Sequence, residues 1–446
     1  MSWKKVKLGE LCLIEKGNTG IQKAIIGDFP LVVTSEERKS HNEFQFDDEA
    51  VIIPLVSSTG HGHKSLKRIH FQTGKFAVGS ILCAVIPKDK TILNAEYLYR
   101  YLDLNREDEL VSRMKGMANV SLPIKEIAKI EIPLPPIEEQ RKFVEAYAEL
   151  ECNNEDLSTE LTHQLTLVKK LRQQLLQDAV QGKLVEQNPK DEPASELLKK
   201  IKAEKEKLIA ENLPAGKAGK LKKEKELPPI KPEEIPFEIP ENWVWCRLGE
   251  IIQYTENLDI QKHLSPETII NYIDIDAIDN KNQVIREVKQ KTVGELSTRA
   301  RRVLKKGYIM YSTVRPYLKN IATIDIELEN FIGSTGFNVF KTILVDSNYV
   351  FNFLLTPKLN DYFKEMMVGF NSPSITNEQF EQTLFPLPPL EEQNRIVQKL
   401  DELMQYCNEL EASIKQSESQ NEKLLQQVLR EALSQPLPME SNAYQS

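Results

Sequence analysis

The sequence of 446 residues lacks the patterns that mark most enzymes and membrane proteins. It has no run of about 18 apolar residues, so no transmembrane helix is expected, and no signal peptide is recognised. The GxxxxGK(S/T) loop of ATPases, the HExxH helix of zinc proteases, the GxSxG elbow of hydrolases and the HxE…PCxxC set of deaminases are all missing. The sequence therefore offers no catalytic constellation and no catalytic residue to propose.

Cysteine is scarce and basic charge is not in excess. The five cysteines form no CxxC pair, which favours a reduced, cytoplasmic protein without a zinc framework. The net charge of −8 and the isoelectric point near 5.6 argue against a typical nucleic-acid-binding protein. They do not exclude one, because a basic groove can coexist with acidic helices elsewhere in the chain.

What the sequence does contain is a nine-residue cassette that occurs twice. Positions 132–140 read Ile-Pro-Leu-Pro-Pro-Ile-Glu-Glu-Gln, and positions 385–393 read Phe-Pro-Leu-Pro-Pro-Leu-Glu-Glu-Gln, 253 positions later. The prolines hold the chain extended, and the glutamates suit the first turn of a helix, where the helix dipole favours negative charge. Each cassette therefore predicts a rigid arm that leads into a helix.

The repeat extends far upstream of the cassettes. Gly116 and Ser121 fall on Gly369 and Ser374 at the same offset. At the domain starts, Trp and Leu-Gly-Glu at positions 3 and 8–10 recur at 243 and 248–250, with the offset now 240. Offsets that change only between blocks indicate loops of different length on a common framework. The chain is therefore predicted to be a tandem duplication of a globular unit and a long helix.

Each cassette is followed by a heptad pattern. The first series is Tyr147, Leu150, Asn154, Leu157, Leu161, Gln164, Val168, Leu171 and Leu175, and the second is Leu400, Leu403, Cys407, Leu410, Ile414, Ser417, Asn421, Leu424 and Val428. Without a third apolar stripe, this spacing favours a coiled coil over a helix buried along a large core. Residues 138–181 would span roughly 66 Å at about 1.5 Å per residue.

The globular units are expected to be α+β. In the first, short β-type runs at 31–33, 51–56 and 80–86 are separated by turns, and a helix is predicted at 95–104. The predicted organisation is a first globular unit (1–137), a long helix (138–185), a charged and proline-rich linker with a short solvated helix (186–240), a second unit (241–390), a second long helix (391–434) and a disordered tail (435–446).

A polar loop is predicted between two strands of the first unit, at residues 57–64. Its hydroxyls and histidines, with the cations that follow, suit contacts to phosphates and base edges. The predicted DNA-binding residues here are Ser57, Ser58, Thr59, His61, His63, Lys64, Lys67 and Arg68. The alternatives are a glycine-rich hairpin loop without a ligand and a metal site at the two histidines, for which no carboxylate or thiol partner is identified.

The second unit carries a different polar set on the same plan. An arginine cluster precedes a strand at 307–312, which leads into a turn with Arg315-Pro316-Tyr317. An arginine and a tyrosine on a rigid turn can supply a bidentate guanine contact and stacking. The predicted DNA-binding residues are Arg299, Arg301, Arg302, Arg315, Tyr317 and Lys319. The alternative for Arg315 is an ion pair with a carboxylate such as Asp325.

Two similar units with different polar loops suit the reading of two sites on one polymer. The linker is long enough for either helix polarity, so spacing alone leaves the polarity open. If the helices pair antiparallel, the units are related by a pseudo-two-fold axis, which would match a bipartite DNA target with half-sites at a fixed separation.

The two cassettes, the Leu-Gly-Glu starts, the Ser312–Pro316 segment and the helix end at 179–184 resemble the specificity subunit of type I restriction-modification enzymes. The resemblance covers nearly the whole chain, although the second helix ends without the Gly-Lys-Leu that follows the first. It implies two target recognition domains separated by antiparallel long helices, and no catalysis by this chain. The helices would dock two methyltransferase subunits, and motor/nuclease subunits would join for restriction.

The resemblance also implies that S-adenosylmethionine binds the methyltransferase partner and not this chain, and no metal site is predicted. Residues assigned to helix–helix contact and partner docking are Leu150, Leu157, Leu161, Leu171, Leu403, Leu410, Ile414 and Leu424. Two other functions stay open: a coiled-coil scaffold that binds only proteins, and a stand-alone endonuclease or methyltransferase, against which the missing motifs speak.

Overall fold

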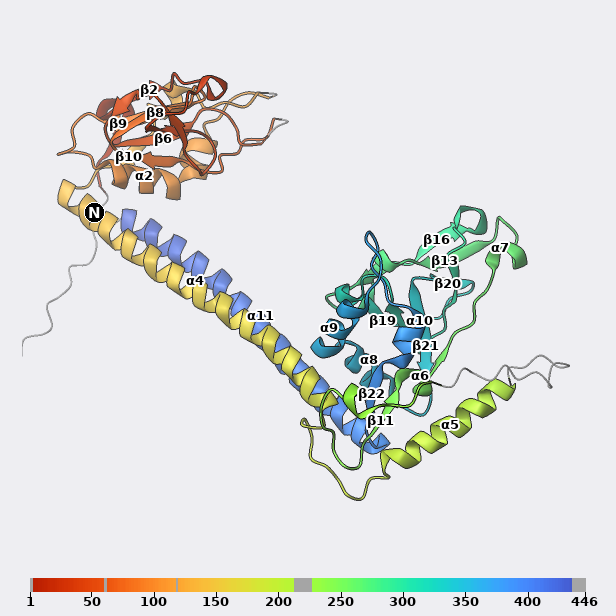
Figure 1. Cartoon of the computed structure of the whole chain (residues 1–446). Helices are drawn as coiled ribbons and strands as arrows, with labels where there is room; N and C mark the ends of the chain where they lie inside the picture. Colours follow the sequence, from red (N-terminus) through yellow and green to blue (C-terminus); the bar gives the residue numbers. More distant parts are fainter. Residues whose placement is uncertain (1–2, 60–61, 118, 212–226, 435–446) are drawn as a thin grey trace, which may run out of the picture. The chain divides into compact units, whose positions relative to one another are not determined.

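The computed structural model describes residues 3–59, 62–117, 119–211 and 227–434. They form two compact units: unit 1 comprises Met1–Gln164 and Ser413–Ser446, and unit 2 comprises Leu165–Ala412. In Figure 1, each unit contains a globular part and a segment of each long helix. Each long helix contributes one part to each unit, so the units are not simply the two sequence repeats.

Unit 1 contains two four-stranded sheets and a covering helix. One sheet has the order β2-β9-β6-β7 and the other β4-β3-β8-β5. Their bounds are β2 Cys12–Lys16, β9 Leu82–Pro87, β6 Ala50–Pro54, β7 His70–Gln72, β4 Lys39–His41, β3 Phe29–Val32, β8 Lys75–Val78 and β5 Phe46–Asp47. In β6, Ala50 and Ile52 belong to the cluster between the sheets, whereas Val51 and Ile53 pack with helix α2 (Ala95–Leu104). Because successive side chains of a strand point to opposite faces of the sheet, this one strand contributes to two cores.

Unit 2 repeats this plan with more loops. Its sheets have the orders β12-β21-β18-β19 and β16-β13-β20-β17. The strands are β12 Ile252–Tyr254, β21 Phe337–Thr342, β18 Ile309–Ser312, β19 Ile321–Thr323, β16 Lys289–Thr292, β13 Ile269–Ile273, β20 Phe331–Ser334 and β17 Ala300–Val303. Helices α8 (Ser347–Leu354), α9 (Pro357–Met366) and α10 (Asn377–Gln382) follow the last strand of these sheets. The predicted α+β class and tandem duplication are confirmed.

Both cassettes have the same structure. In unit 1, β1 (Lys5–Lys7) pairs antiparallel with β10 (Glu131–Pro133), which leads into helix α4 (Ile137–Val180). The second cassette does the same: β11 (Val244–Arg247) pairs with β22 (Leu384–Leu387), which leads into α11 (Leu390–Ser434). Each domain therefore closes by pairing its first strand with the strand that becomes the helix.

The glutamine that ends each cassette anchors the helix to its domain. The side-chain oxygen of Gln140 accepts a hydrogen bond from the backbone N–H of Asn94 at 2.8 Å, and Gln393 accepts one from Asp346 at 2.9 Å. Both glutamines are fully buried, and both partners are N-cap residues, of α2 and α8. A lost partner would leave a buried polar group unsatisfied, so each contact stabilises the angle between the long helix and its domain.

The long helices pair antiparallel within each unit. In unit 1, Asn154 of α4 accepts a hydrogen bond from Asn421 of α11 at 2.6 Å, and in unit 2 Arg172 forms an ion pair with Glu411 at 3.0 Å. Residue numbers rise along α4 while they fall along α11, so the antiparallel coiled coil is confirmed. Asn154 and Asn421 form a polar pair in the seam, which can specify the register.

The seam differs from the predicted one at six of its eighteen positions. Tyr147, Leu161, Val168, Leu400, Cys407 and Ile414 are buried, as the predicted series requires. The exposed positions include Leu157, Leu171, Leu410 and Leu424, where the seam lies one residue further along the helix than predicted. Their neighbours Ser158, Arg172, Glu411 and Leu425 are partly buried instead. Both spacings satisfy a heptad repeat, and the crossing of the two helices decides which one faces inward.

The linker helix α5 (Ala194–Glu211) was expected to be solvated, and this is wrong for one of its faces. Ala194, Leu197 and Ile201 are buried in the same cluster as Trp243 and Leu248 at the start of the second domain. The lysines and glutamates occupy the other faces. Composition alone concealed this apolar stripe, because charged residues outnumber the apolar ones in the segment.

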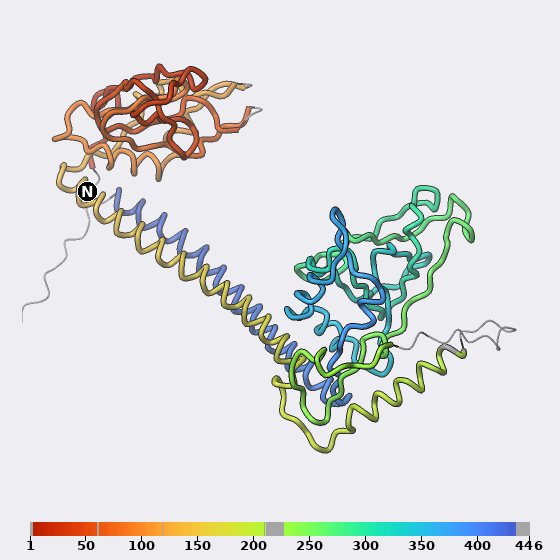
Figure 2. The backbone as a smooth tube through the Cα atoms, viewed as in Figure 1, coloured from red at the N-terminus to blue at the C-terminus, as the bar shows by residue number. Residues whose placement is uncertain are grey.

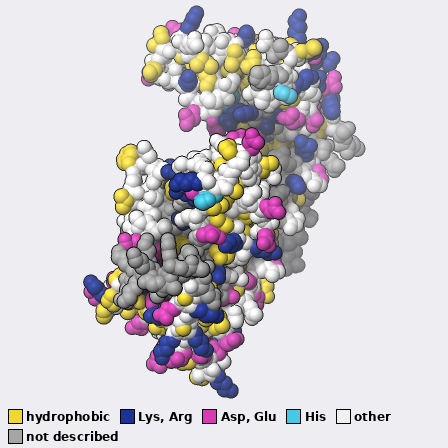
Figure 3. Space-filling model, turned by 90° about the vertical axis from the view of Figure 1, so that its right-hand side faces the viewer, with side chains coloured by type: hydrophobic (Ala, Val, Ile, Leu, Met, Phe, Trp, Pro, Cys, Tyr) yellow, Lys and Arg dark blue, Asp and Glu magenta, His cyan; other side chains and the backbone are white. Residues whose placement is uncertain are grey.

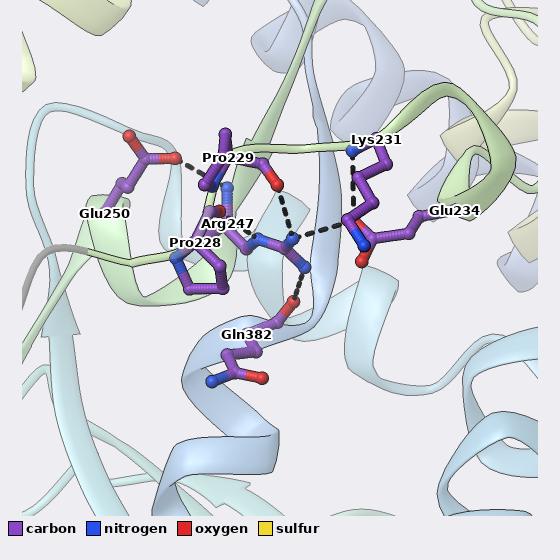
Figure 4. Close-up of polar contacts among 7 residues, drawn as sticks. All are labelled: Pro228, Pro229, Lys231, Glu234, Arg247, Glu250 and Gln382. Carbon is purple, nitrogen blue, oxygen red and sulfur yellow. Dashed lines mark hydrogen bonds and ion pairs between the residues drawn. The ribbon is translucent and has the colours of Figure 1, made fainter.

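The proline-rich end of the linker is held by a buried arginine. Arg247 donates to the carbonyl oxygens of Pro228, Pro229 and Gln382 at 3.1, 3.3 and 2.7 Å and pairs with Glu234 at 2.7 Å (Figure 4). The planar guanidinium can satisfy several acceptors at once. The predicted linker 186–240 is therefore partly packed on unit 2. The predicted tail at 435–446 lies outside the described residues.

Among the described residues, no helix is both long and apolar enough to cross a membrane.

Candidate nucleic-acid interface

The predicted loop of unit 1 lies between β6 and β7. Ser57 Oγ donates to the carbonyl oxygen of His63 at 2.6 Å, and Ser58 Oγ accepts from the backbone N–H of Lys67 at 3.0 Å. Two of the predicted hydroxyls thus close the loop on itself. Thr59 is exposed beside them, and His61 lies outside the described residues. The hydroxyls organise the loop and can still contact a ligand through their remaining lone pairs.

The cations of this loop differ in how firmly they are held. Lys64 Nζ lies 3.5 Å from the carbonyl oxygen of Ser112, and Lys67 is exposed. Arg68 pairs with Glu36 at 2.8 Å on the surface. Surface pairs contribute about 0–1 kcal/mol, so a phosphate could displace Glu36.

A second loop, residues 115–121, belongs to the same site. The backbone N–H of Ser57 donates to the carbonyl oxygen of Val120 at 3.0 Å. Gly62, at φ +80°, packs so closely on Met117 that a Cβ there would lie 2.1 Å from its carbonyl oxygen. Figure 1 shows both loops projecting from the same end of unit 1. We did not predict this loop as part of the site, although the repeated Gly116 and Ser121 marked it.

In unit 2, the predicted arginine cluster lies in and just before β17. Arg302 is buried and donates to Asn257 Oδ1 at 3.1 Å, and burial lowers the pKa of its guanidinium. This corrects the exposed position expected of a DNA contact, because the inward face of the strand takes Arg302 into the fold. Arg299 is exposed, and Arg301 lies 3.7 Å from Asp259 at the surface.

The turn after β18 presents Arg315. Its backbone is left-handed, at φ +48°, and its Nη2 donates to the carbonyl oxygen of Asn371 at 3.0 Å. Such strain in a residue other than glycine persists only where neighbours hold it, and it is concentrated at functional sites. Among the ion pairs of the described residues, none joins Arg315 to Asp325, so the alternative pairing is not observed.

The other two predicted residues of this turn differ. Tyr317 is partly exposed and available for stacking. Lys319 donates to the carbonyl oxygen of Leu355 at 2.8 Å, and burial lowers the pKa of its ammonium group. Lys319 therefore holds the turn against the end of α8 and is not a free surface cation, whereas its contact with DNA stays a prediction.

A cleft beside Arg315 brings in residues that the sequence did not single out. Its wall includes the turn of the hairpin formed by β14 (Ile278–Asp279) and β15 (Val284–Ile285). Polar lining residues are Asp274, Asp276, Asp279, Asn280, Lys281, Arg286, Arg315, Asn320 and Ser372. Hydrogen bonds from the backbone N–H of Lys281 and from Asn282 lower the pKa of Asp279, so its carboxylate stays charged and fixes the turn. Donors and acceptors therefore line one concave surface, as readout of base edges requires.

Basic and acidic side chains of the described residues are both scattered over the face seen in Figure 3. This arrangement agrees with the net charge of −8. Sequence discrimination by a few side chains fits such a surface better than tight non-specific binding to phosphates.

Comparisons with known proteins identify relatives along the chain. The EcoAI type I restriction enzyme specificity subunit of Escherichia coli is 36% identical over 267 residues, which is 56% of this chain and 42% of that protein. The EcoDI specificity subunit of Escherichia coli is 24% identical over 442 residues, covering 97% of this chain and 88% of the relative. The matches to EcoAI and to the similar EcoEI subunit span less than half of those proteins, 42% and 43%.

Solved structures show the same fold. The HsdS subunit from Thermoanaerobacter tengcongensis superposes with a TM-score of 0.52 at 18% identity, over 98% of this chain and 97% of that one. A model of the type I restriction modification DNA specificity domain matches residues 1–167 and 240–417, which include both globular domains and part of both long helices. The chain therefore belongs to the type I restriction modification DNA specificity family.

Proposed function

We propose that this chain is the DNA sequence-specificity subunit of a type I restriction-modification complex. Each globular domain reads one half of a bipartite target. The observation that carries this proposal is one framework with two sets of polar loops. The domains share the anchoring of Gln140 and Gln393, but they present a Ser/His/Lys loop in one case and an Arg315 cleft in the other.

The division of labour follows from what each part offers. Framework residues such as the glutamines are buried and identical in role, so they carry no sequence information. The loops differ in charge, donors and acceptors, which is what two different half-sites need. The paired helices α4 and α11 set the spacer between the half-sites.

We further propose that the helices dock two methyltransferase subunits, with motor/nuclease subunits joining for restriction. The exposed leucines Leu157, Leu171, Leu410 and Leu424 support this role, because leucines on the outer faces of a helix pair leave apolar surface for further helices. The chain itself acts without catalysis in the cytoplasm, and S-adenosylmethionine binds the methyltransferase partner.

The test is to co-express the chain with its methyltransferase subunit, purify the complex and map methylated positions on random-sequence DNA. A bipartite motif with a fixed non-specific gap is expected. Replacing residues 1–137 by those of another specificity subunit should change one half of the motif and leave the other half and the gap unchanged. A stable complex that methylates nothing, or methylates without sequence preference, would instead favour a protein-binding scaffold.

A further inference from the structure

One loop has the same construction in both domains and ends in an exposed apolar side chain. In unit 1 an antiparallel bridge between Lys115 and Ser121 closes it, and in unit 2 the bridge joins Val368 and Ser374. The paired backbone hydrogen bonds are 2.8 and 2.9 Å in the first loop and 3.0 Å each in the second. Both loops are therefore held at their base and not loosely attached.

The residue at each loop tip is apolar and almost fully in water. Met117 is 89% exposed and Phe370 is 100% exposed. Each directly follows a glycine, and both glycines have φ +113°. That backbone conformation strongly disfavours residues with a Cβ. Both copies therefore have a glycine-dependent turn that presents the apolar side chain. A large apolar side chain held in water at the same position twice indicates a partner that covers it.

The neighbours of each tip identify the partner. In unit 2, Arg315 is joined to the loop twice: its N–H donates to the carbonyl oxygen of Pro373 at 2.8 Å and its guanidinium to that of Asn371 at 3.0 Å. In unit 1, Ser57 and Gly62 of the polar loop contact the loop that carries Met117. Figure 2 shows the loop of residues 367–375, in blue, standing out from the body of unit 2. Each apolar tip thus lies beside the groups proposed to read the target.

We propose that Phe370 and Met117 are wedges that insert between adjacent base pairs, one in each half-site. This inference rests on the proposed function, since it requires DNA at both loops. Phe and Met are among the side chains that unstack a base step and kink the duplex. Stacking on the opened bases compensates for the lost base stacking, and pyrimidine–purine steps open most easily. The wedge therefore adds a preference for a deformable step next to the bases that the polar residues read.

Two variants in unit 2 separate insertion from folding. Phe370→Ala removes the wedge without disturbing a buried group. Gly369→Ala keeps the phenyl ring but strains the turn that presents it, because its φ is +113°. Ile269→Ala is the matched control, since Ile269 is also an exposed apolar residue of unit 2 but lies on β13. In unit 1, Met117→Ala has Ile26→Ala as its control.

The experiment uses the complex with the methyltransferase subunit and duplexes that carry the target found by methylation mapping. 2-Aminopurine, which fluoresces when unstacked, replaces one base at a time outside the methylated positions. We expect one bright step in each half-site. Phe370→Ala should abolish only the step in the half-site read by unit 2 and weaken binding about 5-fold to 100-fold, as stacking contributions imply. Met117→Ala should abolish only the other step, and the controls should abolish neither.

The outcomes distinguish the two proposals. If wild-type complex shows no sequence-dependent DNA binding, the proposed function itself fails. If wild-type complex methylates a bipartite target but Phe370→Ala and Met117→Ala leave fluorescence and affinity unchanged, the wedge is refuted and the function stands. Loss of the methyltransferase subunit from either variant during purification would show that the tips bind protein and would likewise refute insertion into DNA.

Discussion

The seam between the long helices predicts opposite outcomes for two leucines one turn apart on α4. Leu161 is 7% exposed and Leu157 is 43% exposed. The bond between Asn154 and Asn421 sets the register of this part of unit 1. Leu161 lies seven residues after Asn154 on α4, and Ile414 lies seven residues before Asn421 on α11. In the antiparallel pair the two residues therefore lie opposite each other, and Ile414 is also buried. We therefore expect Leu161→Ala to destabilise the helix pair and Leu157→Ala to have little effect.

The magnitudes follow from burial. Truncating a buried leucine to alanine typically costs about 2–5 kcal/mol, which includes a contribution from the cavity left behind. A seam of two helices can close over that cavity or admit water, so the lower end, about 2 kcal/mol, applies to Leu161. Leu157 already has much of its side chain in water, and its truncation should cost less than about 1 kcal/mol.

Amide hydrogen exchange measured by mass spectrometry is the suitable assay. The chain has several cores, so global unfolding is not a two-state process, whereas exchange reports the opening of each segment separately. Leu161→Ala should speed exchange in peptides from residues 150–164 by about 30-fold, since about 1.4 kcal/mol corresponds to tenfold. Equal acceleration by both variants, or a larger one by Leu157→Ala, would refute the observed seam and favour the spacing predicted from sequence.

Three further predictions concern recognition, docking and pH. Arg315→Ala should relax or abolish recognition of the half-site read by unit 2 in methylation mapping and leave assembly intact; Lys306→Ala, at an exposed cation of unit 2 outside the predicted set, is the control, and loss of assembly would contradict the assignment. Leu410→Lys should reduce co-purification of the methyltransferase subunit at least tenfold while far-UV circular dichroism stays unchanged; Asn408→Lys, on a neighbouring exposed position, controls for the added charge. His70→Gln should flatten the loss of unit 1 stability between pH 6.5 and about 4, measured by exchange, and an unchanged slope would count against the role of His70.

The sign of the pH effect follows from the environment of His70. Burial, with the charges of Arg38 and Arg68, lowers the pKa of His70 to about 4 from 6.5. Arg38 Nη1 lies 3.1 Å from Nδ1 and can donate to it only while that nitrogen is unprotonated. Below pH 6.5 the unfolded chain binds a proton that the folded chain does not. The contribution of His70 to the stability of unit 1 is therefore fully present above pH 6.5 and falls by up to about 3 kcal/mol as the pH approaches 4.

The sequence by itself determined the duplication, the α+β class and the long helices. Proline arms, glutamates in the first turn and heptads are local signals, because they act within one turn or one strand of the residues that carry them. The strand at 51–56 and the helix at 95–104 were recognisable for the same reason, and they correspond to β6 and α2.

Only the tertiary structure decided which polar side chains remain available to a partner. Arg302 and Lys319 look like surface cations in the sequence, but neighbouring strands and helices enclose them. The same holds for Arg247, whose acceptors lie 13 to 135 positions away in the chain. The seam of the helix pair was likewise decided by the partner helix, since a heptad fits two adjacent stripes equally well. Burial depends on what packs against a residue, and no local pattern encodes that partner.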